Sequence, residues 1–220
     1  MEKRNSNGII IPDVLPMLIV FVALTVLVYF WRGIWSALIP LALVVFTLCF
    51  FRNPNRVISA EEDEIVSPAD GVILAVEEVN ENKYLHGEAT KVSIFLSIFN
   101  VHVNRVPIAG EIEYLYYQPG KFLPAFKSHA SDINERNYVG IRGTHNTNFA
   151  VLVVQITGFI ARRIVCWAKT GDKLEKGDLF GMIKFGSCTE IYLPLGTTVL
   201  VKKGQKVRGG ETIIGRFRNE

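Results

Sequence analysis

The sequence predicts a mainly β soluble domain of antiparallel strands, preceded by an N-terminal hydrophobic helical hairpin. Two observations predict this fold class. The first quarter of the 220-residue chain holds two long runs without a charged residue. Beyond residue 64, short stretches rich in Val, Ile, Phe and Tyr are separated by turns of Gly, Pro, Asn and Asp, which is the composition of β-strands and their connections.

The two uncharged runs are Val14–Trp31 and Ile34–Phe51, and only the turn Arg32-Gly33 separates them. Each run is about long enough to cross a bilayer core of roughly 30 Å at 1.5 Å per residue. Neither shows the polar face of a soluble helix. We therefore expect a polar N-terminus over residues 1–13 and a two-helix membrane anchor over residues 14–51. A shallow re-entrant pair and a pair of buried core helices are the alternatives.

Basic residues flank the hairpin at its two ends rather than at its turn. Lys3 and Arg4 precede it and Arg52 and Arg56 follow it, whereas Arg32 alone lies in the turn. The cytoplasmic flanks of membrane spans carry the excess of Lys and Arg. We therefore expect localisation at the cell membrane, with the soluble domain on the cytoplasmic side.

Composition narrows the function classes. The net charge is +3 and 49% of the residues are hydrophobic, so there is no strongly basic field, and we expect no nucleic-acid partner. The three cysteines, Cys49, Cys166 and Cys188, lie far apart in the sequence. An odd number at this spacing predicts neither a disulfide framework nor a zinc site, and we expect no metal.

Residues 52–64 are predicted to form a polar, partly acidic linker, and residues 65–220 the β domain. Within that domain, Lys121–Asn137 lacks the apolar alternation of a strand and is expected to be a loop or a short helix. The stretches with strand composition are Ile65–Val79, Thr90–Ile98, Gly110–Tyr117, Ala150–Ile156, Ile160–Ala168 and Ile191–Val201.

Two segments near the C-terminus repeat one turn pattern. Gly171–Asp178 and Gly204–Glu211 share the order Gly, any residue, Lys, apolar residue, any two residues, Gly, acidic residue. Such turns enter and leave strands in biotinyl- and lipoyl-like barrels, so the β domain resembles these barrels at the level of its turns. Two unrelated glycine turns are the alternative, and two copies are too few for a solenoid.

The pair Gly186-Ser187 interrupts an apolar run near the C-terminus. Glycine inside a strand-like run usually marks a bulge or a close backbone approach. A serine hydroxyl in such a turn can also attack the preceding carbonyl and convert the peptide into an ester. Elimination and hydrolysis then leave a pyruvoyl group, whose carbonyl can hold an amine and accept the electrons of a departing carboxylate. An ordinary turn is the alternative.

Two further residues have side chains suited to activating a serine. Asp70 lies in the turn sequence Ser67–Ile73, where its carboxylate either caps the turn or orients a base. His102 stands among valines. It is either a core side chain or a general base toward Ser187, because imidazole titrates near neutral pH.

Taken in order, these segments resemble the phosphatidylserine decarboxylase proenzyme family in its short bacterial and archaeal form. The resemblance covers essentially the whole β domain, and the ordered set is more specific than any one member. It implies a membrane-associated, pyruvoyl-dependent decarboxylase that converts phosphatidylserine to phosphatidylethanolamine after self-cleavage. The matching segments are SPADGVI at 67–73, FLSIFNVHVNRVP at 95–107, YQPGKF at 117–122, NERN at 134–137 and KFGSCTEIYLP at 184–194.

The resemblance implies that the chain cleaves its own peptide bond between Gly186 and Ser187. The products are a β chain that ends at Gly186 and an α chain, residues 187–220, that begins with a pyruvoyl group derived from Ser187; the two chains stay partners. Asp70 and His102 are implied to activate Ser187. The pyruvoyl carbonyl then forms a Schiff base with the amine of the phospholipid substrate before CO₂ leaves.

The chain departs from the longer family members at one place. Where they carry two histidines spaced H-x-x-H, this chain has His102 and Arg105. An arginine stays charged at any working pH, so it cannot be a general base. We expect His102 to serve both cleavage and decarboxylation, with His129 as the alternative for one step. Arg105 is expected to meet the substrate carboxylate or phosphate.

Other interpretations of the sequence stay open. The lipid is either phosphatidylserine or its archaeal ether counterpart, archaetidylserine. A non-enzymatic membrane adaptor with a biotinyl-like barrel accounts for the hairpin and the paired turns, but not for Asp70, His102 and Ser187 together. A serine hydrolase fits the residue types, although no G-x-S-x-G elbow is present. The sequence also leaves a homo-oligomer open.

Overall fold

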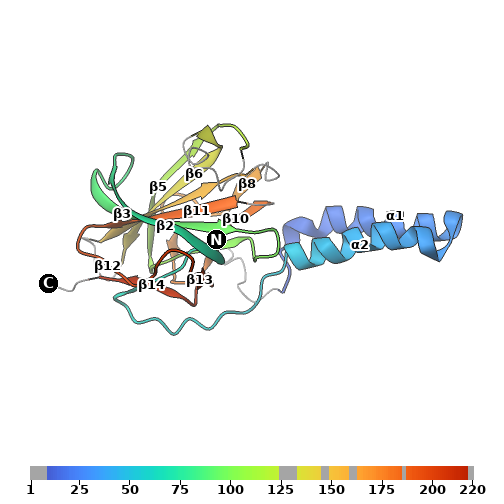
Figure 1. Ribbon diagram of the computed structural model, residues 1–220, viewed down its shortest axis with the longest axis horizontal. Coiled ribbons are helices and arrows are strands. Elements are labelled where there is room, and N and C mark those ends of the chain that lie inside the picture. Colours follow the sequence, from blue (N-terminus) through green and yellow to red (C-terminus); the bar gives the residue numbers. More distant parts are fainter. Residues whose placement is uncertain (1–8, 124–132, 145–148, 159–162, 185–186, 218–220) are drawn as a thin grey trace. The chain divides into compact units, whose positions relative to one another are not determined.

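The computed structural model describes residues 9–123, 133–144, 149–158, 163–184 and 187–217 (Figure 1). The chain divides into two compact units, Met1–Asn55 and Arg56–Glu220. The first unit is helical, and the second is built from antiparallel strands. This confirms the predicted fold class of a mainly β domain preceded by a helical hairpin.

The helical unit consists of a short 3₁₀ turn, η1 (Pro12–Val14), followed by α1 (Leu15–Arg32) and α2 (Ile34–Phe50), which pack against each other. Gly33 makes the tight turn between them with φ of 81°, a conformation that glycine adopts without steric cost. The segments at the open end are also joined, because the Ile11 amide donates to the Phe51 carbonyl at 3.0 Å.

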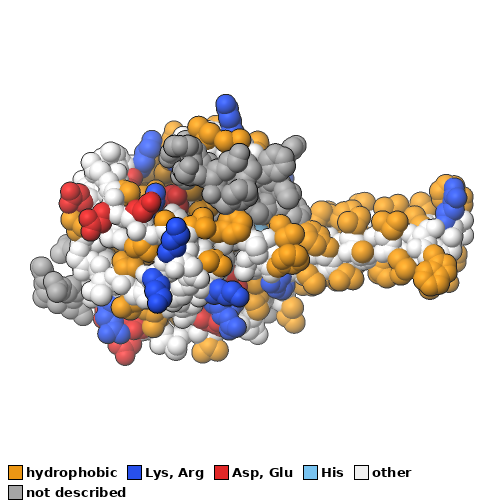
Figure 2. Space-filling view, in the orientation of Figure 1, with side chains coloured by type: hydrophobic (Ala, Val, Ile, Leu, Met, Phe, Trp, Pro, Cys, Tyr) orange, Lys and Arg blue, Asp and Glu red, His pale blue; other side chains and the backbone are white. Residues whose placement is uncertain are grey.

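Apolar side chains cover the outside of the hairpin, as Figure 2 shows. The helical segment Pro12–Arg32 has 21 residues and a mean hydropathy of 2.5, so by length and composition it is able to span a membrane. With 17 residues, α2 is shorter, and Pro40 lies inside it.

The β unit is organised around one curled, eight-stranded antiparallel sheet (Figure 1). The strand contributed by the sequence around Ser187 lies inside this sheet, hydrogen-bonded on both sides. In spatial order the strands are β13 (Lys206–Val207), β2 (Gly71–Glu81), β3 (Gly87–Leu96), β11 (Ser187–Pro194), β7 (Ala150–Ile156), β6 (Arg136–Gly143), β5 (Gly110–Gln118) and β9 (Lys173–Leu174).

Two three-stranded antiparallel sheets complete the unit. One has the order β1 (Glu64–Val66), β14 (Ile213–Arg216) and β12 (Thr198–Val199). The other has the order β4 (Val103–Arg105), β10 (Leu179–Lys184) and β8 (Arg163–Cys166), and it carries the segment that leads into the predicted cleavage site.

The core lies on both faces of the large sheet. Along β11, Ile191 and Leu193 belong to the main apolar core, whereas Cys188 and Tyr192 pack into a second cluster. Successive side chains of a strand point to opposite faces, so the two clusters occupy the two sides of β11. This strand is therefore buried on both faces as well as paired at both edges.

The two repeated turn segments have the same backbone conformation. The four glycines of the shared turn pattern all have φ between 81° and 88°. At the start of each segment, the Gly171 amide donates to Ile112 and the Gly204 amide donates to Ile73, both at 2.8 Å. The echo in the sequence is therefore a structural repeat, as the likeness to biotinyl- and lipoyl-like barrels predicts.

Three strand predictions need correction. The stretch Ile65–Val79 is not one strand, because β1 ends at Val66 and β2 begins at Gly71. The stretch Ile191–Val201 is not one strand, because β11 ends at Pro194 and a turn with φ of 89° at Gly196 precedes β12. The stretch Lys121–Asn137 contains the start of a strand that the sequence did not reveal, since β6 begins at Arg136. The apolar residues of β6 alternate with Gly and Arg in the sequence. They are buried because β6 is a central strand, paired with β5 on one side and with β7 on the other.

Candidate active site

Ser187 is the first residue of β11 and pairs in register with Leu96 of β3. Its side chain is fully buried, and its Oγ makes no hydrogen bond with any of the described residues. A buried hydroxyl without a partner is costly, by about 1–3 kcal/mol. Gly186, the other half of the predicted cleavage site, lies outside the described residues.

His102 lies immediately before β4, next to the strand that leads toward Ser187. The Ile183 amide in β10 donates to the His102 carbonyl at 3.2 Å, and Met182 pairs with Val103. Since β10 ends at Lys184, the chain passes from the neighbourhood of His102 to the start of β11 within a few residues. The His102 side chain is fully buried.

The hydrogen bonding of the His102 ring determines its tautomer. Nδ1 lies 2.9 Å from the carbonyl oxygen of Asn100. A carbonyl can only accept, so Nδ1 carries the hydrogen and, in the neutral ring, Nε2 carries the lone pair. The imidazole is thus held in the form that can take a proton at Nε2, as a general base requires.

Asp70 is part of an ion-pair cluster. Its carboxylate accepts two hydrogen bonds from Nη2 of Arg56, at 3.0 and 2.8 Å, and one from the Gly209 amide at 2.7 Å. Arg56 also donates to Glu211 at 3.1 Å. The Nδ1 hydrogen of His102 is directed to a backbone carbonyl rather than to this carboxylate. A role of Asp70 in activating Ser187 stays a prediction.

Arg105 lies in the same charged region. Its side chain is only 3% exposed, and Nη1 donates to the Gly177 carbonyl at 2.9 Å. Burial of the guanidinium, with a further contribution from the positive charge of Arg56, lowers the pKa of Arg105 to about 10, and the negative charge of Asp70 opposes this shift. Arg105 therefore stays protonated at neutral pH. Its predicted contact with the substrate stays a prediction.

A chain of buried amides runs from β6 to β11. Nδ2 of Asn137 donates to Gln155 Oε1 at 3.0 Å, and Nε2 of Gln155 donates to Asn104 Oδ1 at 2.9 Å. Nδ2 of Asn104 then donates to the Thr189 hydroxyl at 3.1 Å. The chain ends two residues from Ser187, on the strand that begins with it.

Cys188 follows Ser187 but packs on the other side of the strand, among Tyr138, Leu152 and Ile156. Burial raises the pKa of the Cys188 thiol, and the negative charge of Glu190 adds to this shift. The thiol therefore stays protonated at neutral pH. A protonated thiol on the far face has neither the charge nor the position to act on the bond before Ser187.

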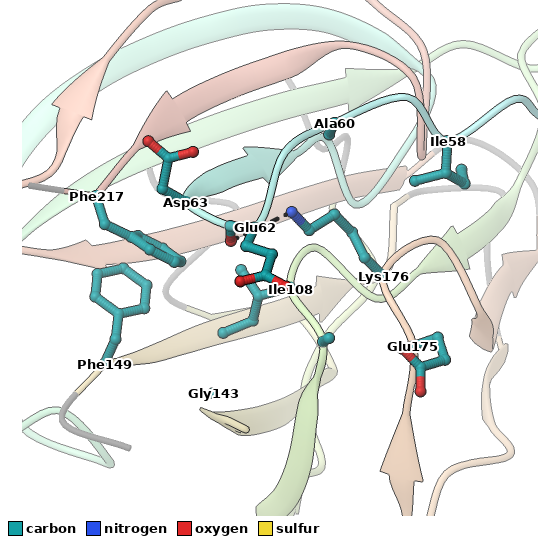
Figure 3. A pocket seen from close by; sticks show the side chains of 11 residues that line it. Ile58, Ala60, Glu62, Asp63, Ile108, Gly143, Phe149, Glu175, Lys176 and Phe217 are labelled. Carbon is teal, nitrogen blue, oxygen red and sulfur yellow. Dashed lines mark hydrogen bonds between the residues drawn. The ribbon is translucent and has the colours of Figure 1, made fainter. Parts of the chain in front are cut away.

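An open cavity of about 280 Å³ lies elsewhere in the β unit (Figure 3). Figure 3 shows Phe149 and Phe217 facing each other on one side, with ring centroids 3.6 Å apart. None of Ser187, His102 and Asp70 lines it. Its lining residues are Ile58, Ala60, Glu62, Asp63, Ile108, Ala109, Gly143, Phe149, Glu175, Lys176 and Phe217.

Two further predictions concern residues or ligands of the site. His129 lies outside the described residues, so its proposed role stays a prediction. Among the residues that the structure describes, no group of three or more His, Cys, Asp or Glu side chains is placed to hold a metal ion.

Comparison with known proteins decides the family. The family model described as phosphatidylserine decarboxylase matches residues 43–215. The chain belongs to the phosphatidylserine decarboxylase family. It is therefore an enzyme of the decarboxylase class, which favours the enzymatic interpretation of the sequence over the adaptor.

Similar proteins in this family match along nearly their whole length. A phosphatidylserine decarboxylase proenzyme from Carboxydothermus hydrogenoformans is 62% identical over 200 residues, covering 90% of this chain and 91% of the relative. Proteins with the same description from Symbiobacterium thermophilum and Syntrophus aciditrophicus are 46% and 42% identical. They cover 92% and 97% of this chain and 93% and 100% of their own lengths.

The sequence does not single out several residues around the candidate site. In the sequence, Arg56 appears only as a basic residue that flanks the hairpin. No neighbouring motif predicts its hydrogen bonds with Asp70. Asn104 could have been found, because it stands two residues after His102 and strand alternation places both on one side. Gln155 and Thr189 lie in strands far apart in sequence, so only the fold brings them to Asn104.

Proposed function

We propose that the chain is a self-cleaving, pyruvoyl-dependent decarboxylase that converts the serine headgroup of phosphatidylserine to ethanolamine. The observation that carries the proposal is the buried Ser187 hydroxyl, which has no hydrogen-bond partner among the described residues and begins a central strand of a family member. The similar proteins are described as proenzymes, which fits an enzyme that matures by processing.

In the proposed cleavage, Ser187 Oγ attacks the carbonyl carbon of Gly186 while Nε2 of His102 takes the hydroxyl proton. The C–N bond breaks, the proton passes to the released amine, and an ester joins the two halves of the chain. Loss of the Cα proton and cleavage of the Cβ–O bond then free the Gly186 carboxylate. Water hydrolyses the resulting dehydroalanine, with release of ammonia, to the pyruvoyl group.

The residues around Ser187 fit such a group. The Ser187 side chain is small and enclosed, and its Oγ makes no hydrogen bond with the described residues, so loss of this oxygen, which leaves the methyl group of the pyruvoyl, breaks no side-chain hydrogen bond among them. Once formed, the pyruvoyl group supplies an electron sink that holds a substrate amine and accepts the electrons left by CO₂. The His102 ring supplies Nε2, a nitrogen that can carry a proton to and from this site.

We further propose that the helical hairpin anchors the enzyme to the cytoplasmic face of the cell membrane. A phospholipid does not leave the bilayer readily, because each buried CH₂ contributes about 0.8 kcal/mol. The enzyme must therefore reach the headgroup at the surface. The apolar exterior of α1 and α2 supports an anchor in the same chain.

Replacement of the serine tests the cleavage proposal. In Ser187→Ala the attacking hydroxyl is missing, so the protein should remain one uncleaved chain and release no CO₂ from phosphatidylserine vesicles. Denaturing mass spectrometry of the wild type should show two fragments, the smaller one beginning with a carbonyl in place of the Ser187 amine.

Ser93→Ala is a matched control, since Ser93 is also a buried serine, on the adjacent strand β3. It should cleave normally. Two fragments from Ser187→Ala, or an intact and active wild-type chain, would contradict the proposal. Parallel assays with diacyl and ether-linked serine lipids would identify the preferred lipid backbone.

A further inference from the structure

The chain of amides beside Ser187 is buried along its whole length. Gln155, Asn104 and Thr189 are fully buried, and Asn137 is nearly so. Asn104 is the branch point, because its Nδ2 atom also lies 3.4 Å from the carbonyl oxygen of Pro68, in the turn before Asp70. One side chain thus contacts three segments that are distant in sequence.

The direction of these hydrogen bonds leaves each amide a single orientation. The carbonyl oxygen of Gln155 accepts from Asn137, so its NH₂ group must face Asn104. The carbonyl oxygen of Asn104 accepts from Gln155, so its own NH₂ group must face Thr189. Flipping Gln155 or Asn104 alone would place its NH₂ group against another NH₂ group, and any flip of Asn104 would set its oxygen against the Pro68 carbonyl oxygen, which can only accept. The Thr189 hydroxyl therefore receives a hydrogen bond of fixed direction.

A glycine makes room for this arrangement. Gly181 lies in the middle of β10, where glycine weakens a strand. A Cβ at this position would come within 2.8 Å of Gln155 Nε2 and within 2.5 Å of the Val165 carbonyl oxygen. The strand beside His102 thus lacks a side chain at the place where the Gln155 amide passes.

The polar chain is unusual for its location, since the neighbouring core is built from aliphatic residues. Buried amides contribute little net stability, and apolar residues of similar shape are often equally stable there. Their benefit is orientation, because a fully satisfied buried network holds its members in one arrangement. Because this amide chain ends close to Ser187, we expect it to hold the proposed attacking group in position.

We propose that Asn104 is a positioning residue for self-cleavage. It links the segment that carries His102 to the strand that begins with Ser187, through the Thr189 hydroxyl. Thr189 stands on the same side of β11 as Ser187 by strand alternation, so the contact holds the start of β11 against β4. The inference rests on the proposed function, and it concerns the rate of cleavage rather than the identity of the attacking group.

The size of the effect follows from the geometry of the attack. The serine oxygen must lie close to the carbonyl carbon, on one face of the carbonyl plane, and a misplacement of about 1 Å reduces a rate by roughly 10²-fold. Without the Asn104 contact, the start of β11 keeps its backbone pairing with β3 and β7 and the packing of Cys188, but it loses the directed hydrogen bond on the Ser187 side. Cleavage should therefore slow markedly while the overall fold persists.

The experiment follows cleavage of pulse-labelled, newly made full-length chain. Thr189→Val removes the acceptor while keeping the shape of the side chain, and it should slow cleavage by about 10-fold to 100-fold. Thr189→Ser keeps the hydroxyl and should restore most of the rate. Asn104→Leu should be at least as slow as Thr189→Val, because it also removes the contacts to Gln155 and Pro68, and the double variant should be no slower than Asn104→Leu, because their shared interaction is already lost.

A loss of stability alone must give a different result. Glu81 is buried at the end of β2, where its carboxylate accepts from the amides of Lys83, Tyr84 and Leu85. Glu81→Ala should lower the melting temperature without slowing cleavage. If it slows cleavage as much as Thr189→Val at an equal loss of melting temperature, the positioning role is overturned.

Failure of this inference is distinguishable from failure of the proposed function. If Thr189→Val and Asn104→Leu cleave at the wild-type rate while Ser187→Ala does not cleave, the positioning role is wrong and the proposed function stands. If Ser187→Ala also yields two fragments, the proposed function itself is wrong.

Discussion

The site combines side chains whose protonation and orientation are set by backbone groups. The Asn100 carbonyl holds the hydrogen of His102 on Nδ1, and the Gly209 amide donates to Asp70. Arg56 completes the coordination of Asp70, so the carboxylate is surrounded by donors. In the proposed reaction, these charges and lone pairs would be directed before any substrate arrives, which is how electrostatic preorganisation acts in enzymes.

At this scale we predict that Cys188 takes no part in catalysis. Its thiol packs away from the Ser187 side, and burial raises its pKa, so it does not become a thiolate as the pH rises from 7 to 9. Cys188→Ala should cleave and decarboxylate at close to the wild-type rate. In the native protein, Cys188 should resist thiol-labelling reagents over this pH range and react only after unfolding in urea.

Peptide mapping of the labelled protein would identify the modified cysteine, with Cys166 as an internal comparison because it is only partly buried. Rapid labelling of Cys188 in the native protein would contradict its burial. Loss of cleavage in Cys188→Ala would contradict the prediction that it takes no part in the reaction.

Among the elements, β11 has a special place, because it would become the N-terminal strand of the small fragment after cleavage. It pairs with β3 along eight residues and with β7 along five. The same fragment contributes β14, which pairs with β1, where Arg216 forms an ion pair with Glu64. Strands of the small fragment are thus distributed through two of the three sheets.

We therefore predict that the two fragments stay together after cleavage. Separating them would expose the core on both faces of β11 and break its backbone hydrogen bonds. Hydrogen bonding from Arg216 lowers the pKa of Glu64 below its ordinary value of 4.5, so this pair contributes above that value and is lost only as the pH falls through the lowered pKa. Retention should hold throughout pH 5–8.

An affinity tag on the large fragment should retain the small fragment in native buffer and release it in denaturant. Elution of the small fragment under native conditions at neutral pH would show that the strands of the two fragments do not hold them together.

At the scale of the whole molecule, the β unit repeats a backbone feature at two glycines, but the residues that precede these glycines differ. Gly71 and Gly110 occupy equivalent places, since a Cβ at either would lie 2.3 Å from a carbonyl oxygen of the next strand, that of Phe95 or Arg142. The residue before Gly71 is Asp70, and the residue before Gly110 is Ala109. The carboxylate therefore precedes only one of these two equivalent glycines.

The division into two units also predicts how the chain tolerates truncation. The main core is built entirely from residues of the β unit. Deleting residues 1–51 removes α1 and α2 but keeps Arg56 and its pairing with Asp70. The shortened protein should move from the membrane fraction to the soluble fraction and still cleave itself. Its decarboxylation of phosphatidylserine in vesicles should fall, because the enzyme is no longer held at the surface.

Cell fractionation followed by gel analysis measures location and cleavage together. A shortened chain that still sediments with membranes would locate the anchor in the β unit. One that no longer cleaves would show that the hairpin is needed to fold the site.

The sequence by itself determined the composition of the elements and the chemical groups available. Two uncharged runs predicted the helices, and periodic apolar residues predicted most strands, because local pattern is governed by which side chains can face water. Gly186 and Ser187 allowed the proposed self-cleavage, and the ordered family segments favoured it over an ordinary turn.

Only the tertiary structure decided which distant residues meet. The pairing of Asp70 with Arg56, the contact of Asn104 with Thr189 and the start of β6 at Arg136 depend on strand order. Strand order is set by burial of the whole core rather than by any one segment, and contacts between segments far apart in the chain leave no local signal.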